Sequence, residues 1–153
     1  VKAHIPGKDF HSRYGLQSTR PLVALLPGSR KQELQRILPL MARVIEKNPN
    51  YQFAVAAVSN LDKSLYSAVS ALSNVVLVEE DTYDLLLHAT SAIVTSGTAT
   101  LETALFKVPQ VVVYKANRVS YFLAKFLVKV DFISLVNLIA GKEIVRELLQ
   151  SQA

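Results

Sequence analysis

Short, continuously apolar runs recur along this chain, and segments whose apolar residues are spaced three and four apart lie between them. Such runs are typical of strands buried on both faces, whereas the spacing of three and four is typical of helices. Strands of this kind that alternate with helices predict a Rossmann-like α/β fold, a doubly wound parallel sheet with helices on both faces. We predict strands over 22–26, 51–58, 75–78, 92–94 and 110–113, and helices over 31–47, 62–72, 83–88 and 99–106.

The first 21 residues differ from the rest, because prolines and glycines interrupt them in the way that is typical of loops. We therefore expect a linker, or a remnant of an interdomain region, over 1–21 and one folded domain over 22–153. Half of the 153 residues are hydrophobic, which is enough for a core without metal or disulfide cross-links. Because the chain begins with Val1, we expect it to be a piece of a longer protein.

The net charge of +5 favours anionic partners, which include phosphorylated small molecules, nucleic acids and anionic membranes. We expect no nucleic acid, because neither a zinc-finger spacing nor an aromatic RNA-binding motif is present. The chain has no cysteine, which excludes disulfides and thiolate metal sites and favours the cytoplasm. No apolar run approaches the roughly 20 residues that span a bilayer.

The loop over 27–33 follows the first predicted strand and opens the first predicted helix. Ser29 and Gln32 have the spacing of a capping box. Arg30 lies beside the positive end of the helix dipole, where an anion would offset its charge. Gly28 allows the backbone to approach a ligand closely. The pattern therefore fits either a phosphate site or a well-capped helix, and it matches neither the P-loop nor the dinucleotide fingerprint.

The loop over 95–102 joins a strand to a helix at the same predicted edge of the sheet. We predict Thr98 as the N-cap, and amides after Gly97 that bind phosphate oxygens. Glu102 fits two interpretations, a carboxylate that accepts from ribose hydroxyls and one that interacts with the helix dipole. Further hydroxyl donors are predicted at Ser96, Thr98 and Thr100.

Four segments together resemble the lipid-A-disaccharide synthases: LLPGSRKQEL at 25–34, TSGTATLETAL at 95–105, PQVVVYK at 109–115 and SLVNLIAGKEIVRELLQ at 134–150. The resemblance covers about 22–150. Members of this family transfer a diacylglucosamine from UDP-2,3-diacylglucosamine to 2,3-diacylglucosamine 1-phosphate (lipid X), with release of UDP, in lipid A biosynthesis. The resemblance implies one half of a GT-B fold, in which two Rossmann-like domains face each other and the C-terminal domain holds the donor nucleotide.

The resemblance also implies roles for individual residues. Arg30 would stabilise the UDP leaving group, Glu102 would bind the uridine ribose, and Asn137 would face the cleft. The donor diphosphate would lie against Gly28, Ser29 and Arg30 on one side and Ser96, Gly97, Thr98, Ala99 and Thr100 on the other. The catalytic carboxylate and the acceptor pocket would belong to an N-terminal domain, so we expect UDP-sugar binding but no turnover from this chain alone. No metal or other cofactor is expected.

A predicted helix over 117–130 combines an apolar face with a face of basic and aromatic residues. This pattern fits peripheral contact with a membrane, which the resemblance would place at the inner membrane of a Gram-negative bacterium. It also fits a core helix with solvated lysines, which is the more frequent case. The apolar face carries Val119, Leu123, Leu127 and Val130, and the other carries Arg118, Tyr121, Phe122, Lys125 and Lys129. Apolar surface left exposed would also favour an oligomer.

Neither the histidines nor the acidic residues predict a metal site. His4, His11 and His88 lack the spacing of metal ligands. The acidic group of Glu79, Glu80, Asp81 and Asp84 is predicted to be a solvated loop, with Asp81 or Thr82 capping the next helix. Two alternative functions remain for the chain, a UDP-sugar epimerase and a non-catalytic nucleotide-sugar-binding subunit that needs a partner chain.

Overall fold

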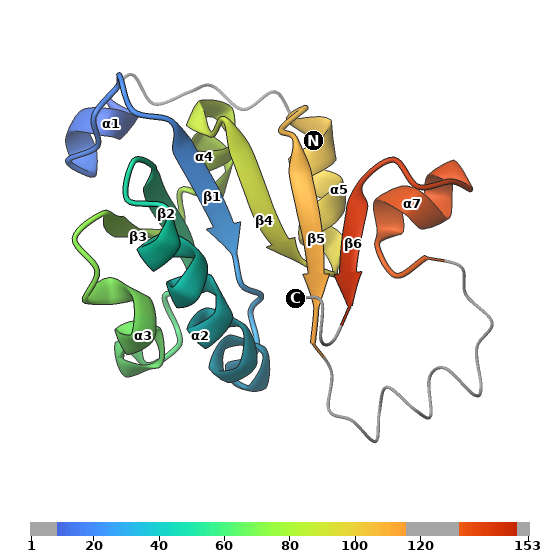
Figure 1. Cartoon of the computed structure of the whole chain (residues 1–153), viewed down its shortest axis with the longest axis horizontal. Coiled ribbons are helices and arrows are strands. Elements are labelled where there is room, and N and C mark those ends of the chain that lie inside the picture. The colour runs from blue at the N-terminus through green and yellow to red at the C-terminus, as the bar shows by residue number, and fades with distance from the viewer. Residues whose placement is uncertain (1–8, 116–131, 150–153) are drawn as a thin grey trace.

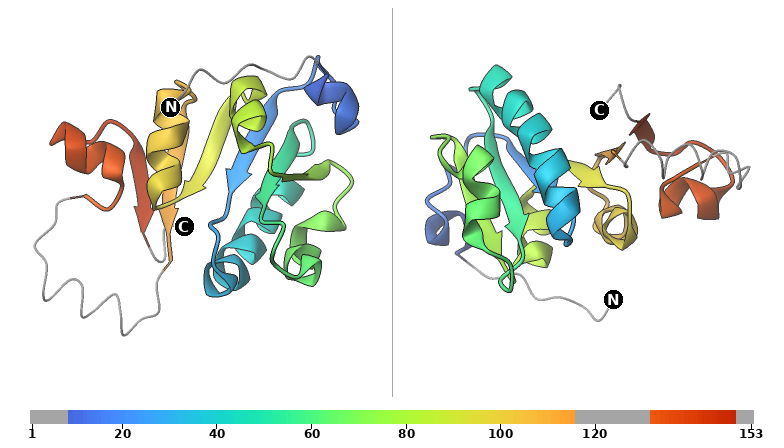
Figure 2. Two further views of the ribbon diagram at one scale, coloured as in Figure 1. Left: turned by 180° about the vertical axis from the view of Figure 1, so that it is seen from behind. Right: turned by 90° about the horizontal axis from the view of Figure 1, so that it is seen from below.

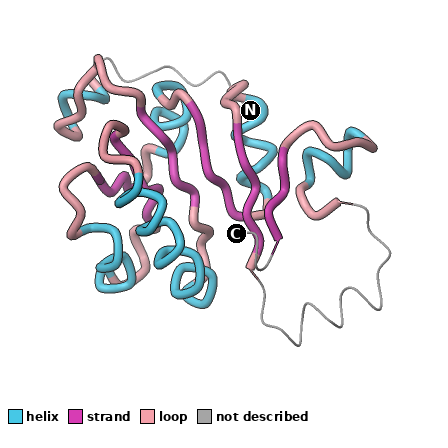
Figure 3. Tube along the Cα trace, viewed as in Figure 1, coloured by secondary structure: helices cyan, strands magenta, loops and turns pink. Residues whose placement is uncertain are grey.

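A computed structural model describes residues 9–115 and 132–149, which form a six-stranded sheet in the order β3-β2-β1-β4-β5-β6 (Figure 1). Every neighbouring pair of strands is parallel. Strands and helices alternate along the chain (Figure 3). The strands are β1 (Leu22–Leu26), β2 (Gln52–Ala57), β3 (Val75–Glu79), β4 (Ser91–Thr95), β5 (Gln110–Tyr114) and β6 (Arg146–Leu149). The helices are α1 (Phe10–Arg13), α2 (Lys31–Lys47), η1 (Lys63–Tyr66), α3 (Ser67–Ser70), α4 (Thr82–His88), α5 (Thr98–Leu105) and α7 (Leu135–Ala140).

The central strand β1 is buried along its whole length, because helices cover both faces of the sheet around it. Successive side chains of a strand point to opposite faces. Val23 and Leu25 therefore pack with α2 in one core cluster, whereas Ala24 and Leu26 pack with α4 in the other. Figure 2 shows these two helical layers from behind and from below. The predicted doubly wound α/β fold is confirmed.

The predicted helix over 62–72 is confirmed in part, because the segment is helical over 63–70 but forms the short 3₁₀-helix η1 followed by the single turn α3 instead of one α-helix. The Asp62 side chain accepts a hydrogen bond from the backbone N–H of Ser64 at 2.9 Å, which tightens the first turn. The buried Tyr66 hydroxyl accepts a hydrogen bond from the backbone N–H of Val58 at 3.0 Å. The Tyr66 contact holds the segment close to the end of β2, because Val58 directly follows that strand.

The second part of the predicted linker packs against the domain. Residues 10–13 form α1, and the side chain of Phe10 is fully buried in the core cluster on the α4 side of the sheet. Farther along, the Gln52 side chain accepts from the backbone N–H of Gln17 at 2.9 Å and donates to the backbone oxygen of Arg20 at 2.9 Å. The Arg20 guanidinium donates to the Pro49 carbonyl at 2.6 Å. Residues 9–20 are therefore bound to the domain.

Two of the acidic residues after β3, Asp81 and Asp84, are paired, which corrects the prediction of a solvated loop at these positions, whereas Glu80 is exposed as predicted. Arg13 of α1 forms ion pairs with Asp81 and with the buried Asp84. Asp81 also accepts a hydrogen bond from the Tyr14 hydroxyl at 2.7 Å. Burial and this hydrogen bond raise the pKa of Tyr14 to about 12. Asp81 precedes the first residue of α4, so these contacts fix the start of α4 relative to α1.

The predicted amphipathic helix over 117–130 lies outside the described residues. Among the described helices, none is both long and apolar enough to cross a membrane.

Candidate functional site

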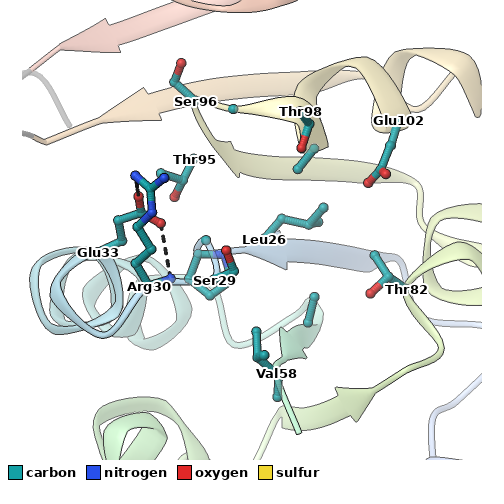
Figure 4. A pocket seen from close by; sticks show the side chains of 16 residues that line it. Leu26, Ser29, Arg30, Glu33, Val58, Thr82, Thr95, Ser96, Thr98 and Glu102 are labelled. Atoms are coloured by element: carbon teal, nitrogen blue, oxygen red, sulfur yellow. Dashed lines mark hydrogen bonds and ion pairs between the residues drawn. The ribbon is translucent and has the colours of Figure 1, made fainter. Parts of the chain in front are cut away.

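A pocket of about 490 Å³ opens at the carboxyl ends of β1 and β4 (Figure 4). The order of the strands reverses between β1 and β4, and ligands of open α/β sheets bind at such switch points. The two loops that the sequence singled out meet here. The predicted site residues that line the pocket are Gly28, Ser29, Arg30, Ser96, Gly97, Thr98, Ala99 and Glu102.

The first loop turns sharply at Gly28, whose φ of 100° lies in the left-handed region that favours glycine. Arg30, rather than Ser29, is the N-cap of α2. The Arg30 backbone N–H donates to Glu33 Oε2 at 3.4 Å, and the Arg30 guanidinium lies 3.6 Å from Glu33 Oε1. The predicted capping pair of Ser29 and Gln32 is therefore wrong by one residue, and the Ser29 side chain is left exposed at the pocket.

Replacing Gly28 with alanine should destabilise the loop and lower the affinity of the pocket for a ligand. A Cβ atom at this position would overlap the Glu33 carboxylate, and a positive φ costs alanine roughly 1–2 kcal/mol. Gly15 provides the control, because its φ is also positive but a Cβ atom there meets open space. Urea unfolding should show a loss of stability for both variants. Titration with UDP, the nucleotide that the resemblance implies, should show weaker binding for Gly28→Ala alone. Equal UDP affinities for the wild type and Gly28→Ala would show that Gly28 does not contribute to the site.

The second loop begins α5 at Thr98, with Gly97 as the N-cap in place of the predicted Thr98. The Thr100 hydroxyl is buried and donates to the Gly97 carbonyl at 2.8 Å, so it supports the turn instead of lining the pocket. The Ser96 hydroxyl donates to the Ile133 carbonyl at 3.0 Å and points away from the cavity in Figure 4. Thr98 remains exposed at the mouth of the pocket.

Glu102 lies one turn into α5, and its carboxylate faces the pocket from the side opposite Arg30 (Figure 4). It accepts a hydrogen bond from the Tyr83 hydroxyl at 3.3 Å. The negative charge of Glu102, together with burial and the hydrogen bond, raises the pKa of Tyr83. Tyr83 thereby positions the carboxylate, whose second oxygen has no hydrogen bond recorded among the described residues. This arrangement suits a carboxylate that accepts from sugar hydroxyls.

Asn137 was expected to face the cleft, and the structure corrects this. It is fully buried in α7 and does not line the pocket. Its Oδ1 atom accepts from the backbone N–H groups of Ile144 and Val145 at 2.7 and 2.9 Å. Its Nδ2 atom donates to the Val145 carbonyl and to Glu147 Oε1, both at 2.8 Å. Asn137 therefore ties α7 to β6.

Glu147 should make the stability of this region depend on pH. Burial alone would raise its pKa, but hydrogen bonds from the backbone N–H groups of Ile133 and Ser134 and from Asn137 outweigh burial and lower it. A lowered pKa in the folded state stabilises the fold above the unfolded pKa, and this contribution is lost as the pH falls through the folded pKa. The difference in free energy of unfolding between the wild type and Glu147→Gln should therefore shrink below about pH 4. A difference that stays constant in urea unfolding from neutral pH to about pH 3 would contradict the assignment.

The structure adds pocket residues that sequence reasoning did not select, among them Glu33, Val58, Thr82 and Thr95. Thr95 is the last residue of β4, and its position at the end of a strand beside the switch point was a signal that could have found it. Thr82 begins α4, and the same reasoning would have included it. Within residues 9–115 and 132–149, no group of three or more histidine or acidic side chains could hold a metal ion.

Comparisons with known proteins agree with the resemblance. The family model described as lipid-A-disaccharide synthetase matches residues 2–153. The lipid-A-disaccharide synthase of Anaeromyxobacter sp. (strain K) is 40% identical over 155 residues, which cover 97% of this chain and 40% of that protein. The corresponding enzyme of Syntrophus aciditrophicus (strain SB) is 42% identical over 147 residues, 92% of this chain and 38% of that protein. The chain thus spans about two fifths of the length of these relatives.

Solved structures show the same fold at low sequence identity. A putative UDP-N-acetylglucosamine 2-epimerase from Listeria monocytogenes matches 92% of this chain and 39% of its own, with a TM-score of 0.54 and 14% identity. The UDP-GlcNAc 2-epimerase from Neisseria meningitidis, bound to UDP-GlcNAc, matches 83% of this chain and 37% of its own, with a TM-score of 0.52 and 17% identity. The family match over nearly the whole chain and the identity to these synthases show that this chain belongs to the lipid-A-disaccharide synthase family.

Proposed function

We propose that this chain is the donor-nucleotide-binding domain of a hexosyltransferase, and that the switch-point pocket holds the UDP part of UDP-2,3-diacylglucosamine. The observation that carries the proposal is the meeting of two helix-opening loops, Arg30 and Glu102 around one cavity. The domain would form one half of a GT-B fold, and the rest of the protein would supply the lipid X acceptor and the catalytic carboxylate. The chain alone should therefore bind UDP without turnover.

The two ends of the pocket suit different parts of a nucleotide. Arg30 is the only cationic side chain among the described residues that line the cavity, and it lies at the end where α2 begins. The N-termini of α2 and α5 both open at the pocket, and each carries unpaired N–H groups and a partial positive charge. Glu102 lies at the opposite end, beyond Thr98 (Figure 4). A nucleoside diphosphate would place its phosphates near Arg30 and its ribose near Glu102.

This arrangement would assist the transfer step by stabilising the leaving group. When an acceptor hydroxyl attacks the anomeric carbon of the donor, its proton would pass to the catalytic carboxylate of the rest of the protein. The bond from that carbon to the diphosphate oxygen breaks, and negative charge grows on UDP. Hydrogen-bond donors that are already aimed at this charge lower the barrier without reorganising during the reaction. Arg30 and the amides of the Gly97–Thr98 turn would supply these donors. This step needs no metal or other cofactor.

The likeness to epimerases does not favour the alternative of a UDP-sugar epimerase, because at 14% and 17% identity it shows the fold alone. Incubation of the purified chain with UDP-N-acetylglucosamine distinguishes the two functions. The proposal predicts that the sugar remains unchanged, whereas formation of its 2-epimer would favour the alternative.

An NMR titration with UDP tests the location of the site. The amide signals of Gly28, Gly97 and Thr98 should shift on addition of UDP. The amides of Tyr51 and Val111 should not shift, because these residues line a second cavity at the amino ends of the strands. Shifts confined to the second cavity would place the nucleotide elsewhere and contradict the proposal.

A further inference from the structure

A buried hydroxyl in the pocket wall has no hydrogen-bond partner among the described residues. It belongs to Thr95, the last residue of β4, which is 8% exposed and lines the pocket. Burying a hydroxyl without a partner destabilises a protein, and such groups are uncommon in native structures. The exception therefore calls for a partner from outside the described residues.

The neighbouring hydroxyls show that this exception is specific to Thr95. Ser96 donates to the Ile133 carbonyl, Thr100 to the Gly97 carbonyl and Thr103 to the Ala99 carbonyl, at distances from 2.8 to 3.0 Å. These three side chains satisfy the backbone of the loop and of α5. Thr95 differs because it is the one directed between the two pocket loops (Figure 4).

The surroundings of Thr95 define the chemistry of the missing partner. Its side chain lies between the Ser29–Arg30 loop and the Ser96–Thr98 turn (Figure 4). The N-termini of α2 and α5 open at the same pocket, and Arg30 also lines it. All three features favour negative charge at this point. A hydroxyl in such a place donates to an anionic oxygen.

We propose that the Thr95 hydroxyl donates a hydrogen bond to a phosphate oxygen of the nucleoside diphosphate that lies between the two loops. The inference rests on the proposed function and names a contact within that same site. Rotation about the Cα–Cβ bond turns the hydroxyl toward the cavity without moving β4, because threonine has staggered alternatives for this torsion. The hydroxyl, which has no partner among the described residues, gains one when the ligand binds.

The substitution Thr95→Val tests this contact, because valine keeps the shape of threonine and removes only the hydroxyl. The variant should unfold at the same or a higher urea concentration than the wild type, since it loses no hydrogen bond in the empty protein. Its affinity for UDP should fall by about tenfold or more, the effect of one hydrogen bond to a charged group. Thr95→Ser should restore most of the affinity.

Thr103→Val is the matched control. Thr103 is fully buried in α5, its hydroxyl is paired, and it does not line the pocket. This variant should lose stability and keep its affinity for UDP, the reverse of Thr95→Val. A stability loss at Thr95 as large as that at Thr103 would show that the Thr95 hydroxyl is already paired in the empty protein, and it would overturn the inference.

Titrations with uridine and UDP locate the contact on the ligand. Thr95→Val should bind uridine, which has no phosphate, as well as the wild type does. An equal loss of affinity for uridine and for UDP would show that the Thr95 hydroxyl contacts the nucleoside, and it would overturn the phosphate contact. Unchanged UDP affinity in Thr95→Val would overturn the inference while leaving the proposed function intact. A wild-type chain that fails to bind UDP at all would instead contradict the proposed function.

Discussion

Replacing Asn137 with alanine should lower the free energy of unfolding by about 3 kcal/mol, because several buried polar groups lose their partner at once. The side chain satisfies two backbone N–H groups, at Ile144 and Val145, and one backbone carbonyl. It also donates to the Glu147 carboxylate. Asn137 is fully buried and its partners Val145 and Glu147 are half-buried, so water replaces these contacts only in part. Urea unfolding of the purified variant measures the loss.

The control for this effect is Asn48→Ala, at the end of α2. The Asn48 side chain donates to the Val44 carbonyl at 2.7 Å in a half-buried position, so its removal should cost about 1 kcal/mol or less. A folded Asn137→Ala variant should keep the UDP affinity of the wild type, because Asn137 does not line the pocket. Loss of UDP binding by Asn137→Ala with unchanged stability would show that Asn137 contacts the ligand, and it would contradict its structural role.

Replacing Arg30 with alanine should weaken UDP binding by about 1.5–3 kcal/mol, roughly 10- to 150-fold, the scale of a hydrogen bond to a charged group. The side chain is 82% exposed, and its ion pair with Glu33 is a surface pair of little energetic weight. Stability should therefore change little, which separates loss of binding from loss of folding. Titration calorimetry with UDP and urea unfolding measure the two quantities.

Lys31→Ala is the matched control for Arg30→Ala. It removes the same charge one residue away, at the first position of α2, from a side chain that does not line the pocket. Its effect on UDP affinity should be several-fold smaller. Equal losses for the two variants would show that Arg30 acts only through the general electrostatic field, and an unchanged affinity for Arg30→Ala would exclude its role in binding.

The features that were predictable from the sequence are those with a strong periodic signal. The strand β1 consists only of apolar residues, and α2 repeats its buried residues every three or four positions, so both have the predicted bounds. The short helix α1 was missed because its four residues carry no period, and Phe10 is buried through a contact with the distant helix α4. Tertiary packing, rather than local pattern, determines such an element.

The same distinction holds for the site. Gly28 and Glu102 could be predicted because loops after strands and the first turns of helices meet at one edge of a parallel sheet. Asn137 could not be oriented from the sequence, because a matching motif places a residue along the chain and not the direction of its side chain. Thr95 stood in the motif, but only the structure shows that its hydroxyl is buried without a described partner.

Titration calorimetry of the purified chain with UDP, with ADP as the control and no added metal, tests the central claim most directly. A donor-nucleotide domain predicts binding of UDP, tighter than binding of ADP, that is unchanged by a metal chelator. Equal binding of the two nucleotides would leave a general diphosphate site without specificity for a UDP-sugar. Binding of neither nucleotide to a folded chain would contradict the assignment of the pocket between β1 and β4 as the donor site.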